Sequence, residues 1–505
     1  DKEKVFSPGT VIISAGAEVS DIRKIVTPVL KPNAEYPVYF IDFSADQLKL
    51  GGSALAQSLN KLGREVPQVK SAAYFRAAFN TVQSMLEKGL ITAGHDVSAG
   101  GLVTALLEMC FPNAGGGLDV DLNSLAGLYE SNKDLISLLF AENPSVLIQV
   151  SNPEETEEYL TQAGIRYCRL GNYIPERNLN IQLKADKHRL DIDALRDIWY
   201  RPSYLLDRRQ SGEKAALERY TYYKNQALEF NFGGNFQGTF HHYGISPDRK
   251  GRSGIKAAII REKGVNGDRE MAYSLHLAGF DVKDVYMTDL MSGRETLEEI
   301  NMIVFVGGFS NSDVLGSAKG WAGGFLFNPT AKKSLDAFYA RPDTLSLGIC
   351  NGCQCMVALD LIYPEHQDKP NMLHNDSHKF ESEFVTVAIP ENHSVMFGSL
   401  AGNKLGIWIA HGEGKFDLPY TEDKYHIVAK YNYDAYPANP NGSKFSAAGL
   451  CSADGRHLAM MPHLERAVFP WQWAHYPAGR NKTDEVTPWI EAFVNAREWI
   501  EMKKA

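Results

Sequence analysis

A cysteine flanked by two glycines is the residue of this sequence with the clearest chemical potential. The stretch Gly348-Ile349-Cys350-Asn351-Gly352 follows apolar residues and precedes residues typical of a helix. Small residues two positions before and after a nucleophile allow a strand to turn sharply into a helix, which exposes the nucleophile at the sheet edge. A helix N-terminus also favours the thiolate, the nucleophilic form. The pattern predicts Cys350 as a nucleophile, whereas Cys353 and Cys355 fall inside the helix.

Two other interpretations of these cysteines stay open. A buried cysteine can be inert core material. The spacing Cys350-x-x-Cys353-x-Cys355 could also supply half of a zinc site, and the histidine to complete it would be His366, His374 or His378. Because the sequence has no second Cys-x-x-Cys pair, we favour the nucleophile.

A cysteine nucleophile needs a general base and a group that orients the base. His463 follows the apolar residues 458–461, and Pro462 turns the chain toward the same sheet edge. Glu465 can hold the imidazole tautomer, as the acidic member of a triad does. His411 is the competing histidine, in a glycine-flanked loop that equally suits contact with substrate or a neighbouring domain. We predict that Cys350, His463 and Glu465 are catalytic.

A pair of glycines offers a third part of the site. Gly307 and Gly308 directly follow an expected strand at residues 302–306. A Gly-Gly turn exposes backbone N–H groups, which could form an oxyanion hole together with the N–H of Asn351. The alternative is a turn that only permits tight packing.

The elements that must position these residues alternate between strand and helix after residue 254. The pattern predicts strands at 255–260, 282–286 and 302–306 and a helix at 268–278, as in a mostly parallel sheet with helices on both faces. Ligands of such sheets bind beyond the carboxyl ends of the strands. The predicted catalytic residues lie at that edge.

The chain before residue 254 is organised differently. Residues 1–188 mix strands and helices as an α+β domain does, and residues 189–253 read as a connector before an α/β domain at 254–505. The expected elements are strands at 38–43 and 145–151 and helices at 50–62, 75–88, 102–110, 153–163 and, within the connector, 208–229.

Composition limits the classes of partner and compartment. In 505 residues, 52 Lys and Arg stand against 61 Asp and Glu, a net charge of −9 without a basic cluster, which argues against nucleic acid. No apolar run approaches the ~20 residues of a membrane-spanning helix. Six cysteines are too few and too uneven for a disulfide framework, so we expect a cytoplasmic protein. Because the chain starts at Asp1 rather than Met, we expect a piece of a longer polypeptide.

In combination these motifs resemble class I glutamine amidotransferases, whose pattern is Gly-x-Cys-x-Gly-x-Gln followed far downstream by His-x-Glu. Further stretches resemble the large, single-chain formylglycinamide ribonucleotide amidotransferase family: 307–310, 313–316, 320–322, 350–354, 411–414, 436–443 and, in the first domain, 50–57 and 95–102. The resemblance implies a flavodoxin-like class I glutaminase domain. It also implies that the domain before it is the α+β C-terminal domain of an aminoimidazole-ribonucleotide-synthetase-like repeat.

The resemblance also implies an activity. Glutamine would be hydrolysed at Cys350, with Gly307, Gly308, Asn351 and Gln354 as oxyanion and substrate residues. In the family, ammonia then passes to a synthetase site, where ATP activates the formamide oxygen of formylglycinamide ribonucleotide. This reaction belongs to purine biosynthesis.

A nucleotide site is implied in the first domain. Asp96 matches a magnesium-binding aspartate of the family and Ser98 a nucleotide-contacting serine, which would bring Mg²⁺ and ATP or ADP as cofactors. Without the resemblance, Asp96 would more simply cap the helix at 102–110. The chain departs from the family at Leu464, where proline is usual, and at Ala99, where a second aspartate is common. It also has less than half of the family's length, so the N-terminal synthetase part and the remaining metal ligands would be missing partners.

Overall fold

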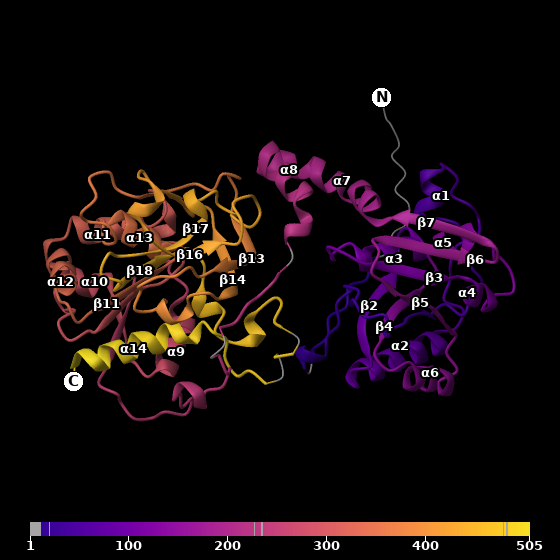
Figure 1. The fold of residues 1–505 in the computed structure, drawn as a ribbon, viewed down its shortest axis with the longest axis horizontal. Coiled ribbons are helices and arrows are strands. Elements are labelled where there is room, and N and C mark those ends of the chain that lie inside the picture. The colour runs from indigo at the N-terminus through magenta and orange to yellow at the C-terminus, as the bar shows by residue number, and fades with distance from the viewer. Residues whose placement is uncertain are drawn as a thin grey trace, which may run out of the picture. The chain divides into compact units, whose positions relative to one another are not determined.

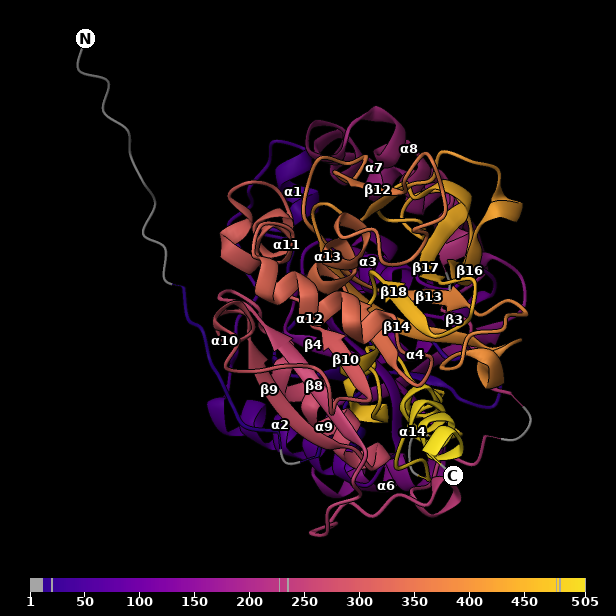
Figure 2. The ribbon, with the colours of Figure 1, turned by 90° about the vertical axis from the view of Figure 1, so that its left-hand side faces the viewer.

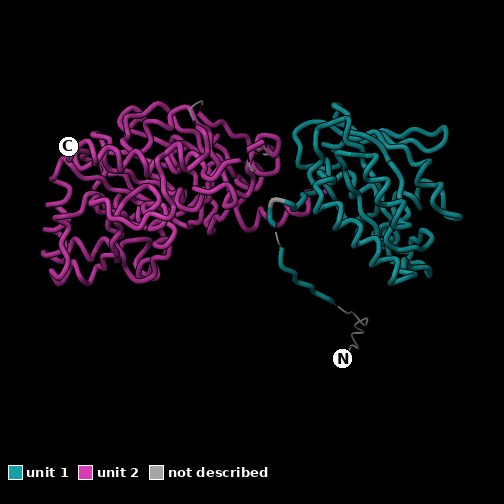
Figure 3. Tube along the Cα trace, turned by 90° about the horizontal axis from the view of Figure 1, so that it is seen from below, with its two compact units in different colours: residues 1–196 teal, residues 197–505 magenta. Residues whose placement is uncertain are grey.

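The computed structural model describes residues 12–19, 21–226, 228–233, 236–477, 479–480 and 483–504. The chain divides into two compact units with a boundary between Arg196 and Asp197, coloured separately in Figure 3. Residues 227, 234 and 235 of the predicted connector lie outside the described residues. The first unit is α+β and the second is α/β, so the predicted fold class is confirmed. Within the described ranges, no helix is long and apolar enough to cross a membrane.

The first unit is built on one sheet in the order β2-β4-β1-β5-β3-β6-β7 (Figure 1). Neighbouring strands are antiparallel except for β3 and β6, which are parallel. The strands are β1 (Val38–Asp42), β2 (Ile91–Val97), β3 (Gly117–Asp121), β4 (Ser145–Val150), β5 (Tyr167–Ile174), β6 (Asn178–Leu183) and β7 (Asp186–Asp191). The helices are α1 (Ala54–Ser58), α2 (Ala72–Glu87), α3 (Gly101–Cys110), α4 (Asn123–Gly127), α5 (Leu135–Phe140) and α6 (Pro153–Gln162).

Strand β1 is buried over its whole length because both faces of the sheet are covered. Val38 and Phe40 pack into the core that includes α3, whereas Tyr39 and Ile41 pack into the core that includes α2. This alternation follows from the two-residue period of a strand. The expectation of a buried strand at 38–43 is thereby confirmed.

The helix expected at 50–62 is wrong at both ends, because only Ala54–Ser58 is helical. Helix α1 ends at Ser58, and Asn60 takes a left-handed backbone conformation with φ 54°. The following loop folds back on the glycines, since Gly51 N–H donates to Glu65 O and Gly52 N–H donates to Leu62 O. These hydrogen bonds between the loop and the glycine turn form in place of a longer helix. Helix propensity, which depends on neighbouring residues only, does not reveal them.

The second unit contains a nine-stranded sheet in the order β14-β13-β16-β17-β18-β11-β10-β8-β9 and a small β12-β15 pair among its described residues. The strands are β8 (Lys256–Arg261), β9 (Asp281–Tyr286), β10 (Met302–Phe305), β11 (Leu345–Ile349), β12 (Asn371–Leu373), β13 (Glu381–Ala388), β14 (Lys404–His411), β15 (Lys415–Asp417), β16 (His426–Tyr431), β17 (Ala447–Cys451) and β18 (His457–Met460). The helices are α8 (Glu213–Thr221), α9 (Asp268–Ala278), α10 (Met287–Ser292), α11 (Lys319–Leu326), α12 (Pro329–Tyr339), α13 (Asn351–Ala358) and α14 (Ile490–Lys504).

One half of this sheet is parallel, as the alternation of strand and helix predicts. The parallel half consists of neighbouring strands in the order β18-β11-β10-β8-β9. The other half, in the order β14-β13-β16-β17, is antiparallel. Helices α10 to α13 pack together on one face, and α9 packs with α14 on the other (Figure 2). Every residue of β10 and β11 is buried, as expected for strands covered on both faces.

The single helix expected at 208–229 is wrong, because the chain breaks at Gly212. Helix α7 (Ile192–Ser211) ends before this glycine, whose φ is 81°, and α8 begins after it. Arg219 of α8 pairs with Asp207 of α7 at 2.9 Å, and its guanidinium also lies over the ring of Tyr436. Glycine permits the bend, and the partly buried ion pair then holds the two helices together.

The ion pair of Arg166 with Asp42 generates a stability prediction for the first unit. The Asp42 side chain is 0% exposed, so Arg166→Met leaves a buried carboxylate without its cation. Breaking a buried pair in this way costs roughly 3–5 kcal/mol. Because Arg166 is partly exposed, we expect the variant to lose about 3 kcal/mol of its free energy of unfolding, the lower end of this range. Urea unfolding followed by circular dichroism measures this loss. Arg169→Met, at an exposed position nearby, should change the free energy of unfolding by less than about 0.5 kcal/mol, and equal effects of both variants would contradict the prediction.

Candidate active site

Cys350 occupies a sharp turn between a buried strand and a helix. It lies between β11 and α13 with φ 51° and ψ −108°, and its N–H donates to Met460 O at 2.9 Å. A Cβ at Gly352 would lie 1.9 Å from Phe305 O, and one at Gly348 would lie 2.5 Å from Met356 Sδ. Both positions therefore require glycine, and the turn has the geometry that the sequence pattern predicts.

His463 reaches the same edge from the end of strand β18. Its backbone N–H donates to Trp408 O at 2.9 Å, and the next residues form a single 3₁₀ turn, Leu464–Arg466. This turn brings Glu465 back to the ring, where His463 Nδ1 and Glu465 Oε1 are 2.7 Å apart. A Cβ at Gly307 would lie 2.7 Å from His463 Cε1 and 3.4 Å from Cys350 Cβ, so His463 and Cys350 both lie against this glycine.

The electrostatics of His463 suit an acid that sits beside a thiol. Burial by itself lowers the pKa of His463, but the carboxylate of Glu465 and the neighbouring Cys350 outweigh it and raise that pKa to about 10. The ring of His463 is therefore protonated at neutral pH. The thiol of Cys350 donates to Ala410 O at 3.4 Å, and a side-chain hydrogen bond with Cys350 also helps to raise the pKa of His463.

His411 has the opposite electrostatics, which separates the two candidate histidines. Burial and the positive charge of His463 lower the pKa of His411 to about 3. Its ring is neutral, and so weak a base cannot remove a proton efficiently near neutral pH. The geometry thus favours His463 as the acid and base of the site.

Asn351 and Gln354 hold the loops around the cysteine. Asn351 Oδ1 accepts from Ser310 N at 3.1 Å, and its Nδ2 donates to Gln354 Oε1 at 3.1 Å. Gln354 Nε2 in turn donates to Glu413 O at 2.7 Å. At the start of α13 the backbone N–H of Asn351 has no intrahelical acceptor. Its backbone can therefore serve an oxyanion while its side chain fixes the Gly-Gly loop.

One residue of this site has no signal in the motifs. Asn375 Nδ2 donates to His411 O at 2.8 Å, and its Oδ1 accepts from Gly414 N at 3.0 Å. Asn375 thereby holds both ends of the loop that carries His411. It is 36 residues away from His411 along the chain, so spacing alone offers no reason to join the two.

The zinc interpretation has no support in the described part of the chain. There, no three His, Cys, Asp or Glu side chains are grouped closely enough to hold a metal ion. Cys353 and Cys355 are buried in α13, and burial raises the pKa of both thiols well above its usual value. Thiols that resist deprotonation are poor zinc ligands.

Asp96 and Ser98, the predicted metal and nucleotide contacts, belong to the first unit. The Asp96 side chain is 74% exposed, and Ser98 is exposed as well. The neighbouring N–H of Gly100, which a phosphate could use at the start of α3, donates to Glu142 Oε1 at 2.8 Å, and the same oxygen accepts from Ala54 N. A carboxylate of the chain itself fills that anion position. One exposed aspartate without further oxygen ligands does not make a magnesium site by itself.

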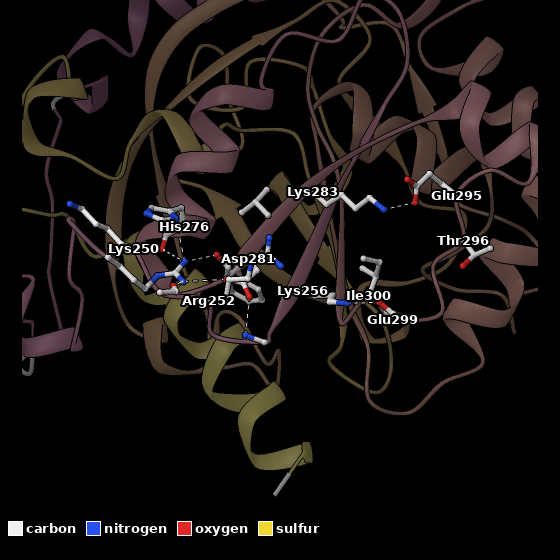
Figure 4. A pocket seen from close by; sticks show the side chains of 15 residues that line it. Lys250, Arg252, Lys256, His276, Asp281, Lys283, Glu295, Thr296, Glu299 and Ile300 are labelled. Atoms are coloured by element: carbon white, nitrogen blue, oxygen red, sulfur yellow. Dashed lines mark hydrogen bonds and ion pairs between the residues drawn. The ribbon is translucent and has the colours of Figure 1, made fainter.

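A cavity of about 640 Å³ lies at the opposite edge of the second unit's sheet (Figure 4). Lys256 begins β8 and Asp281 begins β9, whereas Cys350 follows the end of the parallel strand β11. Three of the cavity's cations are already in ion pairs: Arg249 with Asp281, Lys256 with Glu299 and Lys283 with Glu295. The cavity is therefore remote from the nucleophile, and much of its charge is neutralised.

Comparison with known proteins assigns families to both units. Residues 254–500 match the model of the CobB/CobQ-like glutamine amidotransferase domain, and residues 44–184 match the C-terminal domain of AIR synthase related proteins. The chain is 38% identical over 534 residues to phosphoribosylformylglycinamidine synthase of Homo sapiens, covering 98% of this chain and 39% of the relative. It is 36% identical over 545 residues to the probable phosphoribosylformylglycinamidine synthase of Caenorhabditis elegans, covering 98% of this chain and 40% of that relative. The chain spans about two fifths of the length of these relatives, and nearly all of it is similar to part of a phosphoribosylformylglycinamidine synthase.

Proposed function

We propose that this chain is the glutamine-hydrolysing, ammonia-supplying part of a phosphoribosylformylglycinamidine synthase. The whole enzyme would convert formylglycinamide ribonucleotide, glutamine and ATP to formylglycinamidine ribonucleotide. The observation that carries the proposal is the approach of Glu465 to His463 at 2.7 Å beside the strand-to-helix turn of Cys350. A nucleophile, an acid and an orienting carboxylate meet at one sheet edge, as covalent amide hydrolysis requires.

The proposed reaction has two halves that the same residues serve. The Cys350 thiolate attacks the side-chain amide carbon of glutamine, while N–H groups around Gly308 and Asn351 stabilise the oxyanion. His463 protonates the departing nitrogen, so that the C–N bond breaks and leaves ammonia and a glutamyl thioester. The now neutral His463 then takes a proton from water, which attacks the thioester and releases glutamate.

ATP and Mg²⁺ would serve the synthetase half of the reaction. In this chain Asp96 and Ser98 are the proposed contacts, but the neighbouring anion position is filled by Glu142. We therefore assign no step of glutamine hydrolysis to the nucleotide or the metal. A cytoplasmic location accords with the six cysteines, all of which are free thiols in the structure.

Replacing the nucleophile tests the proposal directly. Cys350→Ala should lower the release of glutamate from glutamine by at least about 10³-fold, because no other group can form the thioester. Glutamate is measured by a coupled dehydrogenase assay. Cys353→Ala removes a buried thiol three residues away and should retain activity within a few-fold. Unchanged glutaminase activity in Cys350→Ala would refute the assignment.

Removing the orienting carboxylate tests the proposed role of His463. Glu465→Gln takes away the main group that raises the pKa of His463, so the ring should lose its proton at a lower pH than in the unchanged chain, where that pKa is about 10. We expect kcat to fall roughly 10²- to 10⁴-fold and the alkaline limb of its pH profile to move toward neutral pH. Glu365→Gln removes a carboxylate 4.0 Å from His366 and is the matched control. An unmoved alkaline limb would contradict the role.

The alternative function is a structural and nucleotide-binding fragment whose glutaminase stays silent until the missing N-terminal synthetase part docks. The burial of the site favours this possibility, because Cys350 is 5% exposed, His463 2% and Glu465 1%. Glutamine cannot reach so enclosed a sulfur unless the surrounding loops move.

The two proposed functions predict different rates of glutamine hydrolysis for the chain without the synthetase part. If docking opens the site, adding the separately produced synthetase part should raise kcat/KM for glutamine at least about 10-fold, within the range of allosteric coupling. Glutamate release is measured with and without that part, with Cys350→Ala as the blank. Equal rates would exclude gating by the missing part.

A further inference from the structure

His411, at the end of strand β14, is a buried polar residue that the proposed mechanism does not use. His411 is only 2% exposed, and neither Nδ1 nor Nε2 of its ring has a hydrogen-bond partner in the described part of the chain. Buried polar atoms in folded proteins are almost always paired, and an exception calls for an explanation such as a ligand. Both ring nitrogens of His411 are such exceptions.

The surroundings of the ring place it beside the reacting groups. The preceding residue, Ala410, accepts a hydrogen bond from Cys350 Sγ at 3.4 Å, and the charge of His463 acts on the His411 ring. On another side the ring packs against Gly414, where a Cβ would lie 2.5 Å from His411 Nδ1. The ring is thus confined between the glycine loop and the catalytic pair.

The loop that carries the ring is fixed from several directions. Asn375 donates a hydrogen bond to His411 O and accepts one from Gly414 N. Gln354 donates to Glu413 O at 2.7 Å. All of these contacts are to the backbone of the loop. They set the position of the ring and leave its two nitrogens for another molecule.

The chemistry of the ring restricts what that molecule can be. A neutral imidazole presents one N–H donor and one acceptor nitrogen. It suits a partner that carries both donor and acceptor groups, such as an amide or an amino acid head group, and it lacks the charge that would bind a phosphate strongly. Glutamine has this chemistry, and it must reach Cys350 for the reaction to begin.

We propose that His411 is a substrate-binding residue whose buried, unpaired ring nitrogens hydrogen-bond to glutamine in the active site. The inference rests on the proposed function and adds to it a residue for recognition, separate from the acid and base. When glutamine is bound, the unpaired nitrogens of the ring gain partners. When it is absent, they remain unpaired, which favours binding of the substrate over an empty site.

The test measures glutamine binding without turnover. In a Cys350→Ala background, His411→Leu should raise the dissociation constant for glutamine at least about 10-fold in titration calorimetry, because the apolar side chain offers no hydrogen bond. His366→Leu in the same background removes a histidine that stacks on Tyr363 and should leave the constant unchanged. Should His411→Leu fail to fold, His411→Ala carries the same comparison.

A second readout separates recognition from a structural role. With Cys350 intact and glutamine absent, the rate of alkylation by iodoacetamide should differ less than about two-fold between His411→Leu and the unchanged chain. An unchanged dissociation constant would overturn the inference, and so would a parallel loss of alkylation rate. If the Cys350→Ala chain binds no glutamine, alone or with the synthetase part, the proposed function itself fails, which is a distinguishable result.

Discussion

The buried contact between Glu465 and His463 is the interaction on which the site depends. Burial alone would lower the pKa of His463 and leave a neutral ring, as it does for His411 nearby. The carboxylate at 2.7 Å reverses that effect. Among the described residues, the carboxylate of Glu465 favours a charged ring at His463, whereas burial and the charge of His463 favour a neutral ring at His411.

Close packing of backbone around Cys350 makes this arrangement possible. Gly352 lies against Phe305 O and Gly307 lies against the ring of His463, so that strands β10, β11 and β18 deliver their ends to one small volume. A side chain at either glycine would push the loops apart. The same packing encloses the sulfur, which connects the precision of the site with its low exposure and with the proposed need for an opening motion.

The parallel sheet and the shared edge of Cys350 and His463 could be predicted because short sequence patterns indicate both. The alternation after residue 254 indicates a parallel sheet, and Cys350 and His463 each directly follow an apolar strand, so their shared edge follows from topology. The helix at 50–62 and the single helix at 208–229 were wrong because other contacts decided them. The N–H groups of Gly51 and Gly52 donate to carbonyls of the loop that follows the shortened first helix, and Gly212 with its φ of 81° breaks the second helix.

Residue types within a few positions were enough to predict the fold class, the strand-to-helix turn at Cys350 and the candidates for base and orienting acid. The choice between His411 and His463 required the folded chain, because their pKa values depend on burial and on which charge lies next to each ring. It also revealed Asn375, which is distant in sequence from the loop it holds, and Glu142, whose carboxylate fills the anion position near Asp96. Such contacts arise only when the chain has folded, because they join segments whose spacing along the sequence carries no information about their distance in space.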